Sequence, residues 1–434
     1  MRPLLPKLSR YRRIVAIGPR HSGKSVLLAS LLDHLRKEPN RFLGAGETWV
    51  RHGVEAFPGR LPAFPLERIL REAAEEAVWP EITTTPSAIR FRAASERAWK
   101  RDLVLDFVDF PGENLADFLG DGSFDCWSEG VADLFPDPMD PPSAEDWRGY
   151  RRHLSEAAEG DGERIAARYA RAVVEATRRG RYLATPSSLC SRVFGPAAEE
   201  AEDFAPLPAA EAARLPGVRA EFERRFAADR SERVEPLEKL LAEADALVVP
   251  VDVGWLLAGG PPLLRDQRHL LESLGRLLER LDTVLNRLAS FVGRSFTPLD
   301  DSSFPGRLRS VVLCATKIDL FRPEERGRLE DLVRRLAEPV FRGAGLHGIQ
   351  VLFTACSAIR STTDAPGADG RLRGFRAGAP VEVVPPSLPE EWPDRWDPAE
   401  FRFPRLDPRV SRNGLYPPAH IHLDRIVRSI LTAR

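Results

Sequence analysis

The chain has 434 residues, with 63 basic against 64 acidic side chains and a formal net charge of −1. This length exceeds the usual size of one hydrophobic core, so one elaborated domain or two domains are expected. The balanced charge gives no support to a nucleic-acid partner, and four scattered cysteines without a C-x-x-C pair argue against a disulfide framework or a zinc site and suit a reducing compartment.

The first predicted elements are a strand at 12–17 and a helix that runs to about residue 37. Between them, residues 18–25 (GPRHSGKS) fit G-x-x-x-x-G-K-[ST], a loop that surrounds nucleotide phosphates with backbone N–H groups. In this part of the chain, the predicted nucleotide contacts are Gly18, Arg20, His21, Ser22, Gly23, Lys24, Ser25 and Val26.

Individual roles follow from the chemistry of these side chains. Lys24 is expected to reach the β- and γ-phosphates and to assist catalysis, and the Ser25 hydroxyl is expected to bind Mg²⁺. Arg20 has two open interpretations: a catalytic positive charge near the γ-phosphate, or an outward-pointing, solvated side chain.

A threonine-rich segment precedes the next predicted strand, at 87–92. GTP-binding proteins place a threonine here whose hydroxyl binds Mg²⁺ and whose backbone senses the γ-phosphate. We predict that Thr83 has this role, with Thr84 and Thr85 as the next candidates. The alternative is that these β-branched residues merely lead into the strand.

The strand predicted at 102–108 ends in the sequence DFPGE at 109–113. A carboxylate at the tip of a strand near a phosphate loop is placed to hold Mg²⁺, so Asp109 is the predicted second metal ligand. The Gly112 N–H is predicted to meet the γ-phosphate, and Glu113 to orient or deprotonate the attacking water.

Residues 114–243 interrupt this alternation of strands and helices. Two stretches, 144–181 and 209–241, are rich in Ala, Glu and Arg with helical spacing, and predict a helical subdomain. After a strand at 245–252, leucines at three-four spacing predict a long amphipathic helix over 263–291. Its apolar face either packs within the protein or meets a partner or a membrane surface.

A predicted strand at 310–315 is followed by TKID at 316–319, which is similar to the [NT]-K-x-D base-recognition motif of GTP-binding proteins. Guanine presents two parallel donors, N1–H and N2–H, and the Asp319 carboxylate is predicted to accept both, with Thr316 and Lys317 beside it. A solvated turn is the alternative. After the last strand, at 348–354, Ser357 and Ala358 are predicted to offer a backbone N–H to guanine O6.

The remaining chain is Pro- and Gly-rich over 366–408, which predicts an irregular extension, and then forms a short closing helix with His420 and His422 at its entrance. The predicted divisions are 1–113 (with an insertion at 39–80), the helical insertion 114–243, and 244–434. No apolar stretch predicts a signal peptide or a transmembrane segment, so a cytoplasmic location is expected, including the periphery of the inner membrane.

Together these segments resemble the YcjX-like family, bacterial stress-associated proteins with a Ras-like GTP-binding core. The resemblance lies in the phosphate loop, in Trp79-Pro80 with Thr83, and in the segments 108–113, 315–319, 358–362, 372–374, 378–380 and 420–424. It implies an α/β P-loop NTPase of the Ras-like type with helical insertions, GTP or GDP binding with Mg²⁺, and a link to envelope stress. Arg20 departs from the family pattern, which has a small or polar residue there.

The predicted function is slow hydrolysis of GTP to GDP and phosphate, in a nucleotide-dependent switch. Many GTPases carry glutamine where this chain has Glu113, and an ionised carboxylate repels the γ-phosphate. Two alternatives stay open: an interaction protein with negligible hydrolysis, and an ATPase or small-molecule kinase of the P-loop class. The expected partners are a guanine nucleotide and, through the helical insertion, a protein effector or a membrane protein.

Overall fold

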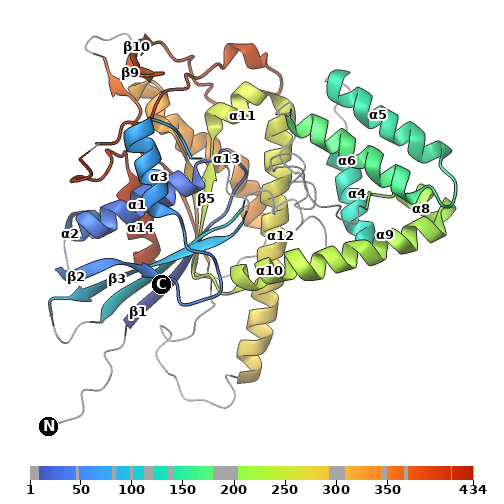
Figure 1. Cartoon of the computed structure of the whole chain (residues 1–434), viewed down its shortest axis with the longest axis horizontal. Helices are drawn as coiled ribbons and strands as arrows, with labels where there is room; N and C mark the ends of the chain where they lie inside the picture. Colours follow the sequence, from blue (N-terminus) through green and yellow to red (C-terminus); the bar gives the residue numbers. More distant parts are fainter. Residues whose placement is uncertain are drawn as a thin grey trace. The chain divides into compact units, whose positions relative to one another are not determined.

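A computed structural model describes residues 9–44, 48–80, 85–97, 101–111, 122–134, 141–178, 204–292, 308–343, 349–365, 370–411 and 413–433. The chain divides into two compact units. The first, the sheet unit, comprises Met1–Pro111, Leu241–Ala258 and Leu281–Arg434, and the second, the helical unit, comprises Gly112–Leu240 and Gly259–Arg280 (Figure 1).

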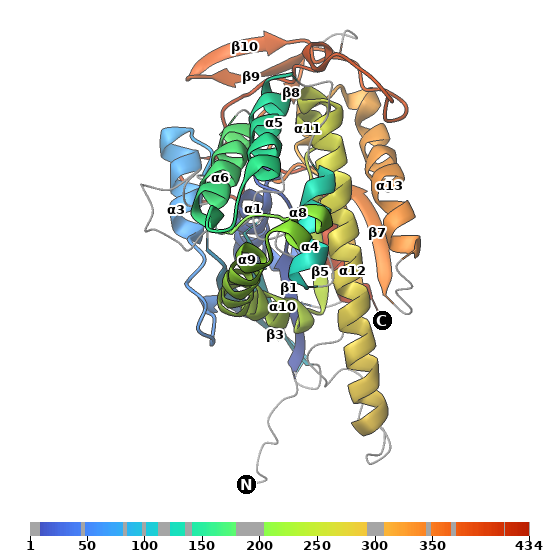
Figure 2. The ribbon, with the colours of Figure 1, turned by 90° about the vertical axis from the view of Figure 1, so that its right-hand side faces the viewer.

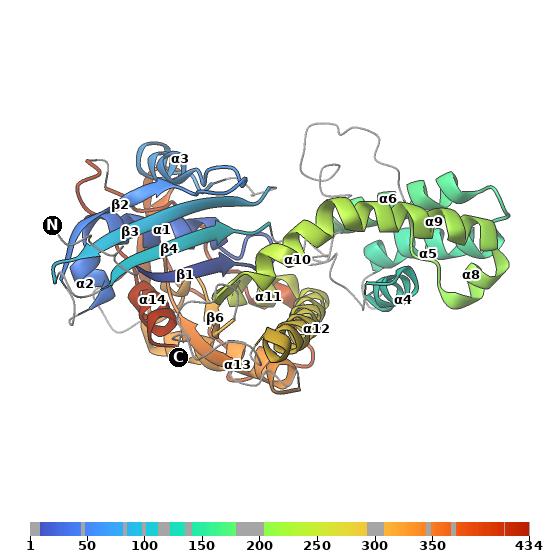
Figure 3. The same cartoon turned by 90° about the horizontal axis from the view of Figure 1, so that it is seen from below.

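A seven-stranded sheet in the order β2-β3-β4-β1-β5-β6-β7 forms the centre of the sheet unit. Its strands are β1 (Ser9–Ala16), β2 (Trp49–Ala56), β3 (Ser87–Ser95), β4 (Asp102–Asp109), β5 (Ala246–Val251), β6 (Ser310–Ala315) and β7 (Gln350–Ala355). The five strands from β4 to β7 in this order pair in parallel, whereas β2 and β3 pair antiparallel (Figure 3). The prediction of a mostly parallel α/β sheet is confirmed.

Helices cover both faces of this sheet, so its central strands are buried throughout. Every residue of β5 and β6 is buried, as expected for parallel strands packed on two sides. Val248 and Val312 lie in one core with α1 (Lys24–Lys37) and α14 (Leu423–Thr432). Alternate residues point to the other face, and α13 (Arg326–Gly343) contacts β6 and β7.

Short helices complete the sheet unit: α2 (Pro39–Leu43), α3 (Leu66–Arg71), the π-helical turn η1 (Glu72–Glu76) and α11 (Val253–Gly259). The first helix, predicted to end at about residue 37, ends at Lys37. The insertion predicted at 39–80 contains an additional edge strand, β2, which sequence analysis missed.

The prediction of an irregular chain over 366–408 is wrong in part. β9 (Leu372–Arg376) and β10 (Ala379–Val383) form an antiparallel hairpin, and β8 (Thr363–Asp364) adds a third strand (Figure 2). The two turn residues, Ala377 and Gly378, have φ angles of 50° and 76°. A two-residue turn with two positive φ angles suits the twist of a hairpin, but alanine in its first position hides the usual sequence signal.

The helical unit is built around aromatic side chains. Its helices are α4 (Phe124–Leu134), α5 (Pro141–Glu156), α6 (Gly162–Arg178), α8 (Ala209–Arg214) and α9 (Pro216–Asp229). Trp127 contacts Phe226 with ring centroids 5.3 Å apart, and Trp147 contacts Tyr150 at 4.8 Å. Both stretches that were predicted to be helical form helices, and α10 (Glu235–Ala242) continues the chain into the sheet unit.

The long helix predicted over 263–291 is α12 (Pro261–Val292). Its first part belongs to the helical unit. Leu270, Leu274 and Leu277 are buried there, which supports the interpretation that this part of its apolar face packs within the protein. Among the helices in the described ranges, none is long and apolar enough to cross a membrane.

Candidate functional site

The candidate site lies where the parallel strands of the sheet end. Ala16 of β1 is level with Asp109 of β4, and Val251 of β5 is level with Ala315 of β6. Because parallel strands point the same way, the loops that follow them leave the sheet at one edge, which is where α/β proteins bind ligands. The predicted phosphate loop, metal ligand and base motif all follow these strands.

The phosphate loop connects β1 to α1 in the conformation that its glycines allow. Gly23 has a φ of 92°, which side chains disfavour, and a Cβ on Gly18 would meet the Pro250 carbonyl oxygen at 3.0 Å. The Ser22 N–H donates to the Pro19 carbonyl, at 3.3 Å, and closes the turn. The sequence places glycine where the backbone turns and where it approaches its neighbour.

The loop ends in a buried lysine and the first turn of a helix. Lys24 is only 6% exposed, and its Nζ donates to the carbonyls of Gly18 (2.8 Å) and Pro19 (3.0 Å). α1 begins at Lys24, followed by Ser25 and the half-buried Val26, without a capping side chain or an acidic residue in its first turn. The N–H groups of a helix's first turn lack partners within the helix and attract anions.

The two described candidate metal ligands lie against each other. The Ser25 Oγ donates to Asp109 Oδ2 at 2.6 Å, although the two residues are 84 positions apart in the chain. A hydroxyl and a carboxylate are oxygen ligands of the kind that Mg²⁺ prefers. The chemistry of this donor pair therefore fits the predicted ion. No group of three or more His, Cys, Asp or Glu that could hold a metal occurs among the described residues.

The base motif is bonded directly to the phosphate loop. Thr316 Oγ1 donates to the Ser22 carbonyl at 2.9 Å, and Lys317 Nζ donates to the His21 carbonyl at 2.8 Å. Lys317 Nζ also forms an ion pair of 2.6 Å with Asp252, at the end of β5. Sequence analysis missed Asp252, although it follows a buried strand just as the DFPGE segment follows β4.

Asp319 is almost fully enclosed, with 2% of its surface exposed. Its Oδ1 accepts from Ser357 Oγ at 2.6 Å, and its Oδ2 accepts from the N–H and the Oγ of Ser361, both at 2.7 Å. Thr362 Oγ1 donates to the Asp319 carbonyl at 2.6 Å. A solvated turn, the alternative for this motif, is therefore wrong. No role was predicted for Ser361, because it lies in a loop without periodicity.

The prediction that residues 357 and 358 offer an N–H to a base is wrong for Ser357. Its N–H donates to the Ile421 carbonyl at 3.0 Å, while its hydroxyl holds Asp319. The Ala358 carbonyl accepts from Ser30 Oγ of α1 at 2.5 Å. This loop is therefore fixed from two sides, by α1 and by the chain that precedes α14.

Positive charge gathers around the phosphate loop. Arg20 is only 5% exposed, so its interpretation as an outward, solvated side chain is wrong. The His21 ring meets Trp255 edge-on, with centroids 5.6 Å apart. Loss of hydration, followed by the charges of Arg20, Lys317 and Arg405, lowers the pKa of His21 to about 4. His21 is therefore neutral at pH 7, and the fixed cations define the local potential.

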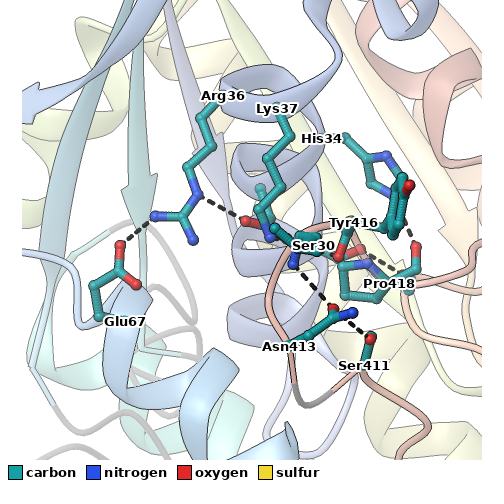
Figure 4. A network of polar contacts seen from close by, with 12 residues as sticks. Ser30, His34, Arg36, Lys37, Glu67, Ser411, Asn413, Tyr416 and Pro418 are labelled. Carbon is teal, nitrogen blue, oxygen red and sulfur yellow. Dashed lines mark hydrogen bonds and ion pairs between the residues drawn. The ribbon is translucent and has the colours of Figure 1, made fainter.

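The chain before α14 is held against α1 (Figure 4). The His34 Nε2 lies 2.9 Å from the Pro418 carbonyl, and Lys37 Nζ lies 3.5 Å from the Tyr416 carbonyl. As predicted, the last two histidines lie at the entrance of the closing helix: His420 Nδ1 accepts from the Leu423 N–H at 3.2 Å. These contacts support the loop that holds Asp319, since residue 421 pairs with residue 357.

Several predicted site residues lie outside the described residues. These are Thr83, Thr84, Gly112 and Glu113, so their roles stay predictions. Thr85, the third threonine candidate, is described and exposed.

The fold and the site together define an α/β protein with a mostly parallel sheet. At the carboxyl edge of this sheet, a glycine-rich phosphate loop connects strand β1 to helix α1. The chain belongs to the YcjX-like family, DUF463, whose model matches residues 13–434. The family suggested by the sequence motifs is thereby confirmed.

Comparisons with solved structures and with curated proteins give less information than the family model. One solved structure, the signal recognition particle receptor SRb-GTP/SRX complex from Chaetomium thermophilum, is 12% identical, with a TM-score of 0.31. The alignment covers 82% of this chain and 96% of that chain. The comparison with curated proteins finds no match.

Proposed function

We propose that the chain binds guanine nucleotides with Mg²⁺ and hydrolyses GTP slowly to GDP and phosphate. The observation that carries this proposal is the direct bonding of the base motif to the phosphate loop. Thr316 and Lys317 donate to the carbonyls of Ser22 and His21, across 294 and 296 positions of the chain. Because the two motifs meet, one nucleotide contacts both.

The phosphates would be held by the loop backbone, by the N–H groups at the start of α1, and by Lys24. Lys24 now donates to two loop carbonyls and would turn its ammonium toward the phosphate oxygens. Ser25 and Asp109 would hold Mg²⁺, whose charge neutralises the phosphate oxygens. The switch threonine proposed to complete this set is Thr83.

The base would be selected by Asp319. A carboxylate has about four lone-pair positions, and Ser357 and Ser361 already fill three of them. Guanine needs two positions for N1–H and N2–H. We therefore infer that the Ser361 hydroxyl turns away when guanine binds, and that the enclosing loop opens to admit the base edge. Adenine lacks this pair of donors and would leave the buried carboxylate uncompensated.

Hydrolysis would be slow, because the residue proposed to orient water is a glutamate. An ionised Glu113 repels the γ-phosphate, and we expect a rate constant on the order of 10⁻³ s⁻¹. The Gly112 N–H is proposed to meet the γ-phosphate. Arg20, a buried residue of the loop itself, is proposed to supply positive charge in cis.

A switch is the second candidate function, with hydrolysis as its reset step. The supporting observation is the order of the chain: the helical unit begins at Gly112, the residue whose N–H is the proposed γ-phosphate contact. A protein effector or membrane-protein partner at this unit is proposed from its place in the chain, and a part in envelope stress is implied by the family alone. Limited proteolysis with GDP and with a non-hydrolysable GTP analogue tests the switch, and identical patterns would count against it.

Nucleotide selectivity is tested by displacing a fluorescent GDP derivative with GDP, GTP, ADP and ATP, with and without Mg²⁺. We expect guanine nucleotides to compete at least 100-fold better than adenine nucleotides, on the order expected for a site that hydrogen-bonds its substrate. Lys24→Ala should weaken binding strongly, and Lys37→Ala, on the same helix, is the matched control. Equal competition by ATP would replace the proposal with the ATPase alternative.

Hydrolysis is tested by single-turnover assays of the wild type, Glu113→Ala and Arg20→Ala. A change of tenfold or more in the rate constant is expected if either side chain acts on the water or the γ-phosphate, in line with the usual size of such contributions. If a variant binds GTP normally and hydrolyses it at the wild-type rate, the role proposed for that residue is wrong. An undetectable rate in the wild type would leave the interaction protein as the function.

A further inference from the structure

A cavity of about 550 Å³ lies within the sheet unit and is lined in part by the loop that holds Asp319. Its walls come from five parts of the chain: Ala73, Ala74 and Ala77; Arg360, Thr362 and Thr363; Phe375 and Gly378; residues 407–411; and Ala419. A volume of 300 to 1,000 Å³ is typical of sites that bind small molecules. None of the residues assigned above to phosphate, metal or base lines this cavity.

Small side chains and hydrogen bonds keep the cavity open. Ala73, Ala74 and Ala77 form one wall and leave its space unfilled. Elsewhere in the lining, the Asp407 carboxylate accepts from the N–H of Gly378 at 2.9 Å and of Ala377 at 3.3 Å. The Asp407 N–H donates to the Phe375 carbonyl at 2.8 Å. The hairpin β9–β10 is thereby tied to the segment 407–411.

The charges in the cavity favour an anion. Two arginines line it, Arg360 and Arg409, against the single carboxylate of Asp407, which already accepts from two N–H groups. Arg360 Nε is buried without a hydrogen-bond partner in the described part of the chain, and its ion pair with Asp364 is long, at 4.0 Å. Arg409 forms no ion pair among the described residues, and lies 5.9 Å from the centre of the Phe375 ring.

We propose that this cavity binds a small organic anion: a carboxylate or phosphate group carried on an apolar body. The anionic group would pair with Arg360 and Arg409, because guanidinium groups bind carboxylates and phosphates through paired N–H donors. The apolar body would lie on Phe375, which is 40% exposed, and on the alanine wall. Binding would satisfy the buried Nε of Arg360.

The position of the cavity makes it a regulatory site, a step that rests on the proposed function. Arg360 and Thr362 line the cavity, and Ser361 between them donates twice to Asp319. An anion that draws Arg360 toward the cavity moves the loop that must open for guanine. The ligand therefore changes the affinity for GDP, and GDP changes the affinity for the ligand by the same factor.

The direct test uses the full chain saturated with GDP and ligand-observed saturation-transfer NMR. The probes are 4-phenylbutyrate, phenyl phosphate and the neutral 4-phenylbutanamide. We expect both anions to bind with a dissociation constant on the order of 1 mM, and the amide at least fivefold more weakly. Arg409→Gln and Arg360→Gln should each weaken the anions at least fivefold. The matched control is Arg376→Gln, an exposed arginine of the same hairpin outside the cavity lining.

A filling substitution guards against an indirect effect of charge. Ala74→Phe places a ring in the cavity and should abolish the binding of all three probes, with GDP affinity retained. The proposal is overturned if no anion binds at 5 mM, if the amide binds as well as the carboxylate, or if the Arg376 and Arg409 variants behave alike. A result in which the anions bind equally to the Ala74 variant would also overturn it.

The coupling is measured separately, by titrating fluorescent GDP in the presence and absence of 20 mM phenyl phosphate. We expect a change of about fivefold in GDP affinity, absent in Arg409→Gln. If the probes bind but GDP affinity does not change, the anion site stands and its regulatory role is wrong. If the protein binds no guanine nucleotide, the proposed function fails, and the NMR test on the nucleotide-free chain still decides the anion site.

Discussion

Replacing Asp319 with asparagine separates the structural part of this side chain from its proposed part in base selection. The change is nearly isosteric, and it replaces an ionised acceptor with one acceptor oxygen and an NH₂ donor. In the wild type, three hydrogen bonds from Ser357 and Ser361 end on the carboxylate, which is 2% exposed. Both consequences of the substitution follow from this count.

The structural cost is moderate. The asparagine oxygen can keep both bonds from Ser361, and the Ser357 hydroxyl can reverse to accept from the NH₂ while it donates to the Ile359 carbonyl, now 3.1 Å away. Three charge-assisted bonds become neutral, at about 0.5–1 kcal/mol each, and the smaller cost of burying an amide offsets part of this. We expect a net loss of about 1–2 kcal/mol in the free energy of unfolding.

The effect on guanine is larger, because an amide donor then faces the two donors of the base. An unpaired buried donor pair costs about 2–4 kcal/mol, which corresponds to a loss of about 30- to 1,000-fold in GDP affinity. Xanthine carries a carbonyl in place of the 2-amino group and accepts from the new NH₂. We therefore expect the preference to move from GDP toward xanthosine diphosphate.

The assay is a fluorescence titration of both nucleotides, combined with thermal unfolding of the nucleotide-free protein. Asp331→Asn, a carboxylate with 66% of its side chain exposed, is the control and should change neither quantity. If Asp319→Asn lowers the melting temperature but binds GDP as tightly as the wild type does, the carboxylate supports the loop and does not read the base.

Four further outcomes are expected. Ser361→Ala frees a lone pair on the Asp319 carboxylate, which is proposed to read the base, and should raise GDP affinity about threefold, a gain of one weak hydrogen bond; a loss in the same titration would contradict the lone-pair count. Gly23→Ala strains a φ of 92° and should lower GDP affinity at least tenfold, whereas Gly53→Ala, with open space around its Cβ position, should leave it unchanged. Burial, and next the charge of His420, lowers the pKa of His34 to about 4. The pKa of an unfolded histidine is about 6.5, so the free energy of unfolding does not suffer from His34 above that pH and falls by about 3 kcal/mol as pH drops from 6.5 to 4. Thermal unfolding of His34→Gln should show a smaller fall over this range. An equal fall would assign the loss of stability to other groups. Asp106→Asn removes the charge that pairs with Arg90, whose Nε donates at 2.6 Å, and should cost about 3 kcal/mol in urea unfolding with GDP affinity retained; a matching loss of affinity would show that this ion pair of β3 and β4 also supports the candidate site.

The parts of the fold that the sequence predicts are those with strong local signals. The strands that became β5 and β6 are continuous apolar runs, and such runs indicate strands buried on both sides. The phosphate loop combines fixed spacing with its strand and helix context. Sequence analysis did not predict the hairpin β9–β10, because Ala377 in its turn has a positive φ, a conformation normally found for glycine or asparagine.

The parts of the candidate site that were missed depend on tertiary contacts. Ser361 reaches Asp319 only because its loop is fixed between α1 and residue 421. Asp252 acquires its partner, Lys317, from the neighbouring strand 65 positions later. Neither contact leaves a periodic pattern in the sequence. A carboxylate directly after a buried strand is the one signal that would have found Asp252.

Joining the two ends of the chain in one site has a consequence during synthesis. The ribosome makes the loop around Lys24 first, whereas Ser361, which holds Asp319, and Ile421, which pairs with Ser357, are made much later. The two parts of the candidate site therefore form at different times. The guanine nucleotide proposed above needs both parts, so it would stabilise the protein only after the segments around Ser361 and Ile421 have been made.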